Sequence, residues 1–278
     1  MKWEGDAEAA LKRIPFSARR KVKARAEAAA VKAGKETVTL ADALHAGGDT
    51  IDDAAVEASH GGDGFRLEVC SGGGVCPNRA HRHSGGDSRQ LAEQIRTHLE
   101  KAAMGDFLRR HVKGPVRAHH AFTVSLSDCP NACSRPQIKD IGIIGAASPV
   151  LTDNACIMCG ACEGACREGA VSVDVSHETP VIERERCISC GGCIAVCPTG
   201  KIEAGVSGYR VMIGGKLGRH PRLASELRDI KDAQTVLCIV EWCVDEYKRL
   251  STRGRRFAQI VADDPDGMLS RLSAECRL

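Results

Sequence analysis

The chain has 278 residues, with 15 cysteines against five Phe, two Trp and two Tyr. Charged residues make up 27% and apolar residues 43%, a balance that excludes an intrinsically disordered chain. Lys and Arg number 39 and Asp and Glu 36, an excess too small to indicate nucleic-acid binding. No apolar run reaches the roughly 18 residues that a membrane span needs. We therefore expect a globular chain whose many thiols need an explanation.

The N-terminus indicates the compartment. Its first ten residues, MKWEGDAEAA, are interrupted early by acidic side chains and contain no apolar stretch, unlike a secretory signal. We therefore expect a cytoplasmic protein. Thiols stay reduced in the cytoplasm, where clustered cysteines bind metal more often than they form disulfides.

Residues 1–46 predict a small helical module. A second helical pattern covers residues 17–32, and Thr39 is placed to cap a short third helix over residues 40–45. Residues 47–64 are rich in Gly and Asp and predict a linker. The first helix is marked by apolar residues at helical spacing: Trp3, Ala7, Ala10, Leu11 and Ile14.

Residues 65–150 and 205–278 mix strand patterns with helical ones. The predicted strands are 65–69, 121–126, 141–144 and 209–213. The predicted helices are 90–104, 223–227, 235–249 and a last helix that ends near residue 272. This mixture predicts an α+β fold.

Between these two parts, residues 151–204 contain an internal repeat. A shift of 31 residues carries Gly160 to Gly191 and Gly169 to Gly200. The same shift carries one set of four cysteines onto another: Cys156, Cys159, Cys162 and Cys166 onto Cys187, Cys190, Cys193 and Cys197.

The spacing within each copy predicts two [4Fe–4S] clusters. Three cysteines at intervals of three on a tight loop can place their thiolates at three corners of a cube, and the fourth ligates the other cluster in two-cluster ferredoxins. Arg167 departs from the pattern that Pro198 keeps, and the alternative is a pair of zinc sites with four cysteine ligands each. The segment resembles the bacterial two-cluster ferredoxin family. The predicted sets are Cys156, Cys159, Cys162 and Cys197 for one cluster, and Cys187, Cys190, Cys193 and Cys166 for the other.

Four further cysteines form two widely separated pairs, Cys70 with Cys76 and Cys129 with Cys133. Their spacing favours a metal centre over a disulfide, and either a third cluster or a zinc ion remains open. Asn131 lies between the second pair, where its amide can reach a cofactor. Three other cysteines fall outside these sets: Cys238, Cys243 and Cys276. Cys238 and Cys243 lie in an apolar helical stretch, and we expect each to be a small buried apolar side chain.

Two strings around these cysteines carry a resemblance. CPNAC followed by IKDIGIIG, and GYRVMIGGKLGRHPRLASEL at residues 208–227, resemble the sulfite and nitrite reductase family, especially its dissimilatory type. The resemblance covers about residues 65–278 and implies a reductase-like half domain with the ferredoxin module inserted. Residues 1–46 resemble a domain at the end of a light-independent protochlorophyllide reductase subunit.

The resemblance also implies a site. The third [4Fe–4S] cluster would be held by Cys70, Cys76, Cys129 and Cys133, and Cys133 would bridge it to a sirohaem. Asn131, Gly214 and Gly215 would lie beside that cofactor. Histidines near the pairs are interpreted as loop and strand-edge residues: His81, His83, His119 and His120. Cations for an anionic substrate would come from Arg66, Arg79, Arg82, Lys113, Arg117, Lys139, Lys216, Arg219 and Arg222.

The implied function is an oxidoreductase that reduces sulfite or nitrite. Electrons from a donor protein would pass through the ferredoxin clusters and the third cluster to sirohaem. The family has a further domain before its first cysteine, whereas only 69 residues precede Cys70 here. The alternatives are therefore an electron-transfer protein, or an accessory subunit that lacks sirohaem and completes its site with a partner chain. A homo- or hetero-oligomer fits either interpretation.

Overall fold

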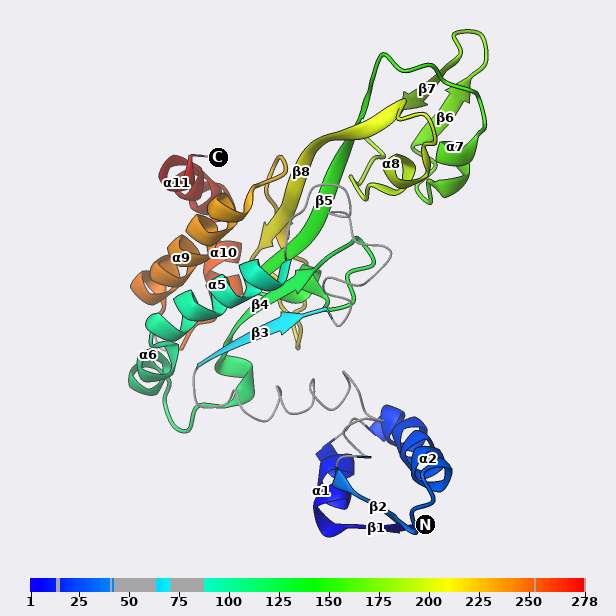
Figure 1. Cartoon of the computed structure of the whole chain (residues 1–278). Coiled ribbons are helices and arrows are strands. Elements are labelled where there is room, and N and C mark those ends of the chain that lie inside the picture. Colours follow the sequence, from blue (N-terminus) through cyan, green and yellow to red (C-terminus); the bar gives the residue numbers. More distant parts are fainter. Residues whose placement is uncertain (14–15, 41, 43–63, 71–87, 253, 278) are drawn as a thin grey trace. The chain divides into compact units, whose positions relative to one another are not determined.

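The computed structural model describes residues 1–13, 16–40, 42, 64–70, 88–252 and 254–277 (Figure 1). These residues divide into two compact units, Met1–Gly62 and Asp63–Leu278. The predicted linker falls outside the described residues except for its last glycine. None of the described helices has the length and apolar character that a bilayer crossing requires.

The first unit is small and mostly helical. Its core consists of Ala26, Ala30 and Val38 with Trp3 packed against them, so small side chains let the helices approach. The Trp3 indole donates a hydrogen bond to Glu27 at 3.0 Å. Two short parallel strands join its ends, which a helical pattern does not predict. Its elements are β1 (Lys2–Trp3), α1 (Gly5–Arg13), α2 (Phe16–Lys32) and β2 (Thr37–Val38).

The second unit is built on a five-stranded sheet in the order β3-β4-β5-β8-β9. The first three strands are parallel, whereas β8 runs antiparallel to β5 and β9 antiparallel to β8. Because three neighbouring strands are parallel, their carboxyl ends meet at one edge of the sheet. The strands are β3 (Phe65–Val69), β4 (Phe122–Ser127), β5 (Ile141–Leu151), β8 (Ile202–Ile213) and β9 (Ser225–Glu226).

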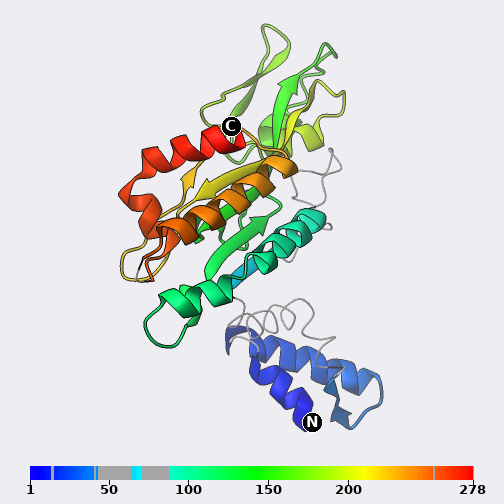
Figure 2. The ribbon, with the colours of Figure 1, turned by 90° about the vertical axis from the view of Figure 1, so that its left-hand side faces the viewer.

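Helices cover one face of this sheet (Figure 2). The main core lies between them and contains an aromatic group in which Phe122 lies 5.5 Å from Tyr247 and 5.4 Å from Phe257, centroid to centroid. Alternate strand residues, such as Ile143 and Val211, point into this core. The helices are α5 (Ser88–Lys101), α6 (Met104–His111), α9 (Ala233–Leu250), α10 (Phe257–Asp263) and α11 (Pro265–Cys276).

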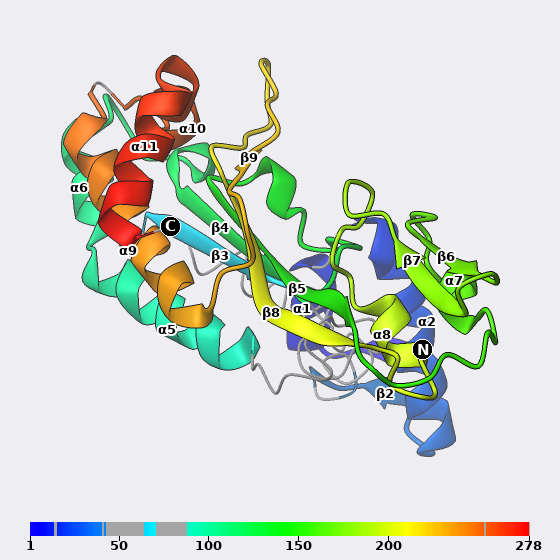
Figure 3. The same cartoon turned by 90° about the horizontal axis from the view of Figure 1, so that it is seen from above.

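The opposite face is called here the site face, and in the described part of the chain none of these five helices covers it (Figure 3). Successive side chains of a strand point to opposite faces, so the neighbours of the core residues point to this face. The site face comprises Arg66, Glu68, Thr123, Ser125, Ser127, Ile144, Arg210 and Met212.

The longest departure from the predicted elements is the β5–β8 ribbon. Both strands continue well past their predicted ends, and their pairing runs from Ile141 with Ile213 to Leu151 with Ile202. At its far end the ribbon carries the cysteine-rich insert (Figure 1). The insert consists of α7 (Ala161–Ala165), β6 (Val171–Asp174), β7 (Thr179–Ile182) and α8 (Gly192–Val196).

Two helix predictions need correction. The helix predicted over residues 90–104 is α5 and ends at Lys101, and the unpredicted α6 begins at Met104, after Ala103 adopts a left-handed conformation with φ of 47°. The helix predicted over 223–227 is wrong: this segment holds strand β9. Its two leucines have helical spacing, but Leu227 donates its backbone N–H to Val211 of β8 at 2.8 Å.

Candidate metal centres

The insert brings its eight cysteines together as two sets of four. One hollow of about 300 Å³ is lined by the set that we call the outer site: Cys156, Cys159, Cys162 and Cys197. A second hollow of about 310 Å³ is lined by the set that we call the inner site: Cys166, Cys187, Cys190 and Cys193. Each hollow takes three cysteines from one copy of the repeat and the fourth from the other copy.

The repeat also determines the backbone around each hollow. Met158 and Gly160 have positive φ of 53° and 69°, and their counterparts Ser189 and Gly191 have 54° and 73°. These left-handed turns fold each loop tightly and let its N–H groups face the sulfur atoms. Backbone N–H donors reach Sγ in both sites: Met158 to Cys156 at 3.4 Å, Ala170 to Cys166 at 3.2 Å, Gly192 to Cys190 at 3.4 Å and Ile202 to Cys197 at 3.4 Å.

The thiols differ in how easily they lose a proton. Burial raises the pKa of Cys193 to about 11, and the nearby Cys190 and Cys187 add to the rise. Burial also raises the pKa of Cys162. For Cys197, burial is outweighed by hydrogen bonds from Ile202 and Thr199, so its pKa is lowered. A buried thiol with a raised pKa becomes a thiolate when a metal takes the place of its proton.

Among the described residues, no three or more His, Cys, Asp or Glu side chains are arranged to hold a single metal ion. The cysteines instead surround open hollows. A [4Fe–4S] cubane binds each thiolate through a different iron and therefore takes ligands that surround a larger body. The donor set, the hollows and the N–H···S hydrogen bonds all fit such clusters.

The third set of cysteines begins where two neighbouring parallel strands end. Cys70 follows β3, and its N–H donates to Leu126 of β4 at 2.9 Å. The Asp128 N–H donates in turn to Cys70 Sγ at 3.4 Å, next to the buried Cys129. Cys133 is exposed, and the Asn131 side-chain amide donates to its Sγ at 3.0 Å. Cys76, the predicted fourth member, lies outside the described residues.

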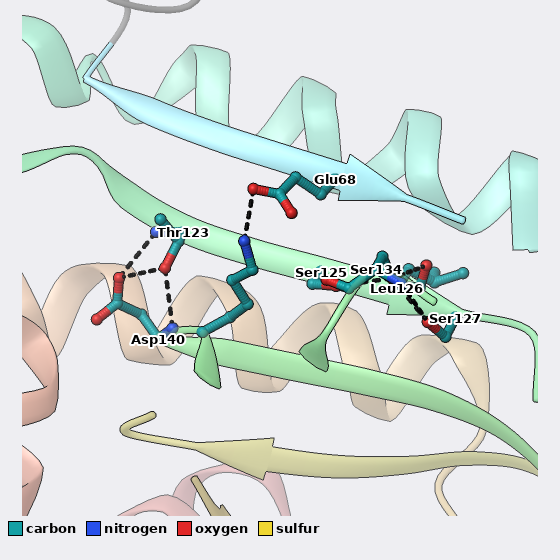
Figure 4. A network of polar contacts seen from close by, with 8 residues as sticks. Glu68, Thr123, Ser125, Leu126, Ser127, Ser134 and Asp140 are labelled. Atoms are coloured by element: carbon teal, nitrogen blue, oxygen red, sulfur yellow. Dashed lines mark hydrogen bonds and ion pairs between the residues drawn. The ribbon is translucent and has the colours of Figure 1, made fainter. Parts of the chain in front are cut away.

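A buried serine fixes the loop that carries Cys129 and Cys133 (Figure 4). Ser134 Oγ donates to the Leu126 carbonyl at 2.9 Å and lies 2.8 Å from Ser125 Oγ and 2.7 Å from Ser127 Oγ. Ser125 also reaches the Ser134 carbonyl at 2.8 Å. The loop is therefore tied to the site face of β4. Sequence reasoning missed this role, although serines two apart on a strand share a face.

A comparison with known proteins identifies the family. Residues 68–263 match the nitrite and sulphite reductase 4Fe-4S domain. The chain belongs to this family. Residues 3–46 match the family described as proto-chlorophyllide reductase 57 kD subunit. Both matches confirm the resemblances that the sequence motifs predicted.

Individual relatives match shorter stretches. A coenzyme F420-dependent sulfite reductase of Methanocaldococcus jannaschii is 39% identical over 151 residues, which are 54% of this chain and 21% of that protein. One subunit of the anaerobic sulfite reductase of Salmonella typhimurium is 32% identical over 108 residues, 39% of this chain and 26% of that protein. The match thus spans about a quarter or less of each relative.

The fold has a counterpart among solved structures. A crystal structure of dissimilatory sulfite reductase I superposes with a TM-score of 0.51 and 16% identity, over 81% of this chain and 57% of that chain. At this identity the likeness concerns the fold alone. It confirms the predicted α+β class for this member of the nitrite and sulphite reductase family.

Two arginines have buried guanidinium nitrogens that could bind an anion. Arg66 Nε and Arg222 Nη1 are buried donors without a partner among the described residues, and a buried guanidinium is a ready partner for a carboxylate. Such donors and the exposed Cys133 thiol are groups of the kind that a sirohaem, whose ring carries carboxylates around an iron, would need. Asp128 departs from this pattern, since both of its buried carboxylate oxygens also lack a partner there.

The structure gives other roles to several predicted site residues. Lys139 is buried and forms an ion pair with Glu68 at 2.5 Å. Gly214 and Gly215 donate their N–H groups to Asp140 and Lys139, at 2.8 and 2.9 Å, and a side chain on Gly215 would collide with the Gln137 carbonyl. Close packing of the backbone therefore explains why glycine occupies both positions.

The remaining predicted cations and histidines are scattered. Those outside the described residues are Arg79, Arg82, His81 and His83. Among the described ones, Lys113, Arg117, Arg219 and His119 are exposed, whereas Lys216 is partly buried in a short pairing with Arg222. Burial, with the neighbouring His119, lowers the pKa of the partly buried His120.

The prediction for Cys238, a free buried side chain, is wrong. Cys238 and Cys276 form a disulfide between α9 and α11, with Cα atoms 5.9 Å apart. Local spacing does not reveal this contact, because the two residues are 38 positions apart and meet only when the helices pack. Cys243 is fully buried, as predicted, and burial raises its pKa.

Proposed function

We propose that this chain is the iron–sulfur part of a sulfite or nitrite reductase, with three [4Fe–4S] clusters and Cys133 turned toward a sirohaem. One observation supports it above all: the eight cysteines of the insert line two hollows in sets of four. Family membership supports the third cluster, for which the described residues supply three ligands at adjacent strand ends.

The residues of the third site would have different roles. Cys70 and Cys129 are held by β3 and β4, and the Ser134 hydrogen bonds keep Cys133 in place at the surface. The Asn131 amide donates a hydrogen bond to the Cys133 sulfur at 3.0 Å, which orients this side chain. When bound, a sirohaem supplies an iron that takes the anion and delivers electrons to it.

The substrate's charge points to a role for the guanidinium groups. Sulfite and nitrite are anions, and preorganised cations in a partly dry site stabilise negative charge. Arg66 and Arg222 each have a buried nitrogen without a partner among the described residues, whereas Lys139 is paired with Glu68. We therefore assign ring or substrate contact to the two arginines and a positioning role to Lys139.

The length of the match favours a second function as well. The matched stretch is about a quarter or less of each sulfite reductase relative, and one of these is named as a subunit. An accessory electron-transfer subunit without sirohaem would use the same three clusters. Its Cys133 would then face a cofactor or a cluster on another chain.

Purification without oxygen separates these functions. We expect about twelve iron atoms per chain, since each cubane holds four. Extraction with acidic acetone should release a sirohaem with its visible absorption if the first function holds. About eight iron atoms would remove the third cluster, and zinc in place of iron would contradict both functions. Three clusters without any tetrapyrrole, in cells that make sirohaem, would favour the accessory subunit.

A substitution at Cys133 tests the bridging role. Cys133→Ser should abolish sulfite- or nitrite-dependent turnover and change the signal of the third cluster in electron paramagnetic resonance spectra. The signals of the inner and outer sites should persist. Cys243→Ala is the matched control, since Cys243 is a buried thiol of the helical core and belongs to none of the three sets. Full turnover by Cys133→Ser would contradict the proposal.

A further inference from the structure

The inner and outer sites differ in their contact with the sheet. The inner loop is joined to β5, because Ala147 donates its N–H to Ser189 at 2.8 Å and forms a bridge with Cys190. The outer hollow is lined only by residues from 156 to 202. Next to it, Ile157 is 61% exposed and Met158 42% exposed. The inner site therefore faces the sheet and the outer site faces outward.

One charged side chain lies at the junction of the inner loop and the sheet. Arg210 of β8 donates from Nη1 to the carbonyl of Ile188, the residue that follows Cys187, at 3.3 Å. Its Nε and Nη2 donate to the two carboxylate oxygens of Glu226 at 2.5 and 2.7 Å. The pKa of Arg210 is raised, mainly by this hydrogen bonding to Glu226, and the charge on Cys187 contributes.

Arg210 is also connected, through packed side chains of the site face, to the loop that carries Cys133. Arg210 pairs directly with Ile144 of β5, so their side chains share a face. Ile144 packs with Met212 and with Ala132, the residue before Cys133. Arg210 therefore lies between the inner loop and the Cys133 loop, with this small apolar cluster on its other side.

We propose that Arg210 is a positioning residue that holds the Cys187–Cys190 loop on the sheet and raises the reduction potential of the inner cluster, with Glu226 opposing its charge. A nearby positive charge favours the more negative, reduced state of a cluster. The inner site then accepts electrons from the outer site and lies next to the Cys133 loop. Each transfer moves one electron from outer to inner site, changes no bond and no proton, and draws on a one-electron donor protein.

This inference rests on the proposed function, and a redox titration of the holoprotein tests it. The reductive titration is followed by electron paramagnetic resonance, with iron content measured for every variant. Arg210→Gln should lower one of the two insert potentials by about 59 mV, a tenfold change in the one-electron equilibrium. Glu226→Gln should raise the same potential, and Arg210→Lys should move it by less than half as much as Arg210→Gln.

Two controls assign the signals. Lys201 lines the outer hollow and donates to the Thr152 carbonyl at 2.7 Å, so Lys201→Gln should lower the other insert potential. Arg96→Gln removes the same charge from α5 and should move neither potential. A wild-type protein without insert clusters would refute the proposed function itself.

If the clusters are present and neither Arg210→Gln nor Glu226→Gln changes a reduction potential, the role of Arg210 is overturned. The proposed function is not affected by that result. Equal shifts in both insert potentials would overturn it as well. If the Arg210→Gln protein does not bind the inner cluster, the reduction potential of Glu226→Gln is the test. A higher potential supports the role of Arg210, and an unchanged potential overturns it.

Discussion

The helical core and the cysteine-rich insert belong to one compact unit, yet they are held together differently. Four of the five phenylalanines and both tyrosines lie in the core between the sheet and its helices: Phe65, Phe107, Phe122, Phe257, Tyr209 and Tyr247. Residues 151–204 contain no Phe, Trp or Tyr. The few large aromatic residues of the chain are therefore concentrated in the helical core, and the insert lacks them.

The insert builds its interior partly from its ligands. Its small core includes Cys162 and Cys193 as buried members, with Val171, Ile194 and Ile202 beside them. A segment of this size buries little apolar surface, and the proposed metal clusters would add stability to it as internal cross-links. The helical core thus depends on apolar burial, whereas under the proposed function the insert would depend on bound metal.

The largest expected effect comes from removing the metal. Treatment with a chelator and an oxidant should destroy the clusters and unfold the insert, while the sheet and its helices stay folded. Hydrogen exchange of backbone amides should show lost protection in 161–196 and retained protection in α9 and β4. Retained protection throughout the apo insert would contradict this division of the unit.

Phe122→Ala should destabilise the helical core and leave the insert unchanged. Phe122 is 1% exposed and contacts both Tyr247 and Phe257, so its truncation should lower the free energy of unfolding of the core by about 3–5 kcal/mol. Denaturant unfolding followed by circular dichroism measures the loss. The reduction potentials of the insert clusters should not move, and a shift in them would show that the two regions are coupled.

Gly142→Ala probes the close contact between β5 and the loop of the third site. An added Cβ would lie 2.2 Å from the Pro136 carbonyl oxygen and 2.7 Å from Met212 Cγ. We expect a loss of about 1–3 kcal/mol in unfolding free energy, from overpacking. Gly164→Ala in α7 is the matched control, since its Cβ would meet nothing within 4 Å. Equal stabilities of the two variants would contradict the contact.

The smallest effect concerns pH. Burial raises the pKa of Asp140, against the opposing effects of Arg256 and of Thr123, whose N–H and hydroxyl both donate to one carboxylate oxygen (Figure 4). A raised folded-state pKa contributes stability below the unfolded pKa of about 4, which is lost as pH rises through the folded pKa. The stability of Asp140→Asn relative to the native chain should therefore rise with pH over that window.

Urea unfolding of both proteins at several pH values measures this difference. Asn keeps an acceptor for both Thr123 donors and stays neutral, so the hydrogen bonds alone produce no pH dependence. A difference in stability that is constant across pH would show that the Asp140 carboxyl has an ordinary pKa.

Sequence spacing predicted the parts of the site that are local. The gaps between Cys156, Cys159 and Cys162 constrain one loop, and the exchange of the fourth cysteine between copies was taken from two-cluster ferredoxins. The two hollows bring together the sets predicted in this way. The strand over residues 65–69 also matched, because alternating apolar and charged residues between a glycine and a cysteine are a local signal.

Contacts between distant segments were not predictable in this way. The hydrogen bond from Arg210 to Ile188 and the disulfide between Cys238 and Cys276 depend on how strands and helices pack. The extension of β5 beyond Ile144 was missed because its sequence, GAASPV, contains small residues and a proline that weaken the strand pattern. The ribbon forms because both strands find partners in each other.

This ribbon makes the insert a cassette. The chain leaves the sheet at Leu151 and returns at Ile202, two residues that face each other across one antiparallel pair. A tight turn of two residues could close the same gap, and any small domain whose ends lie a strand apart could occupy it. Gene rearrangements at this point can therefore add, exchange or delete a small domain without altering the register of any strand in the sheet.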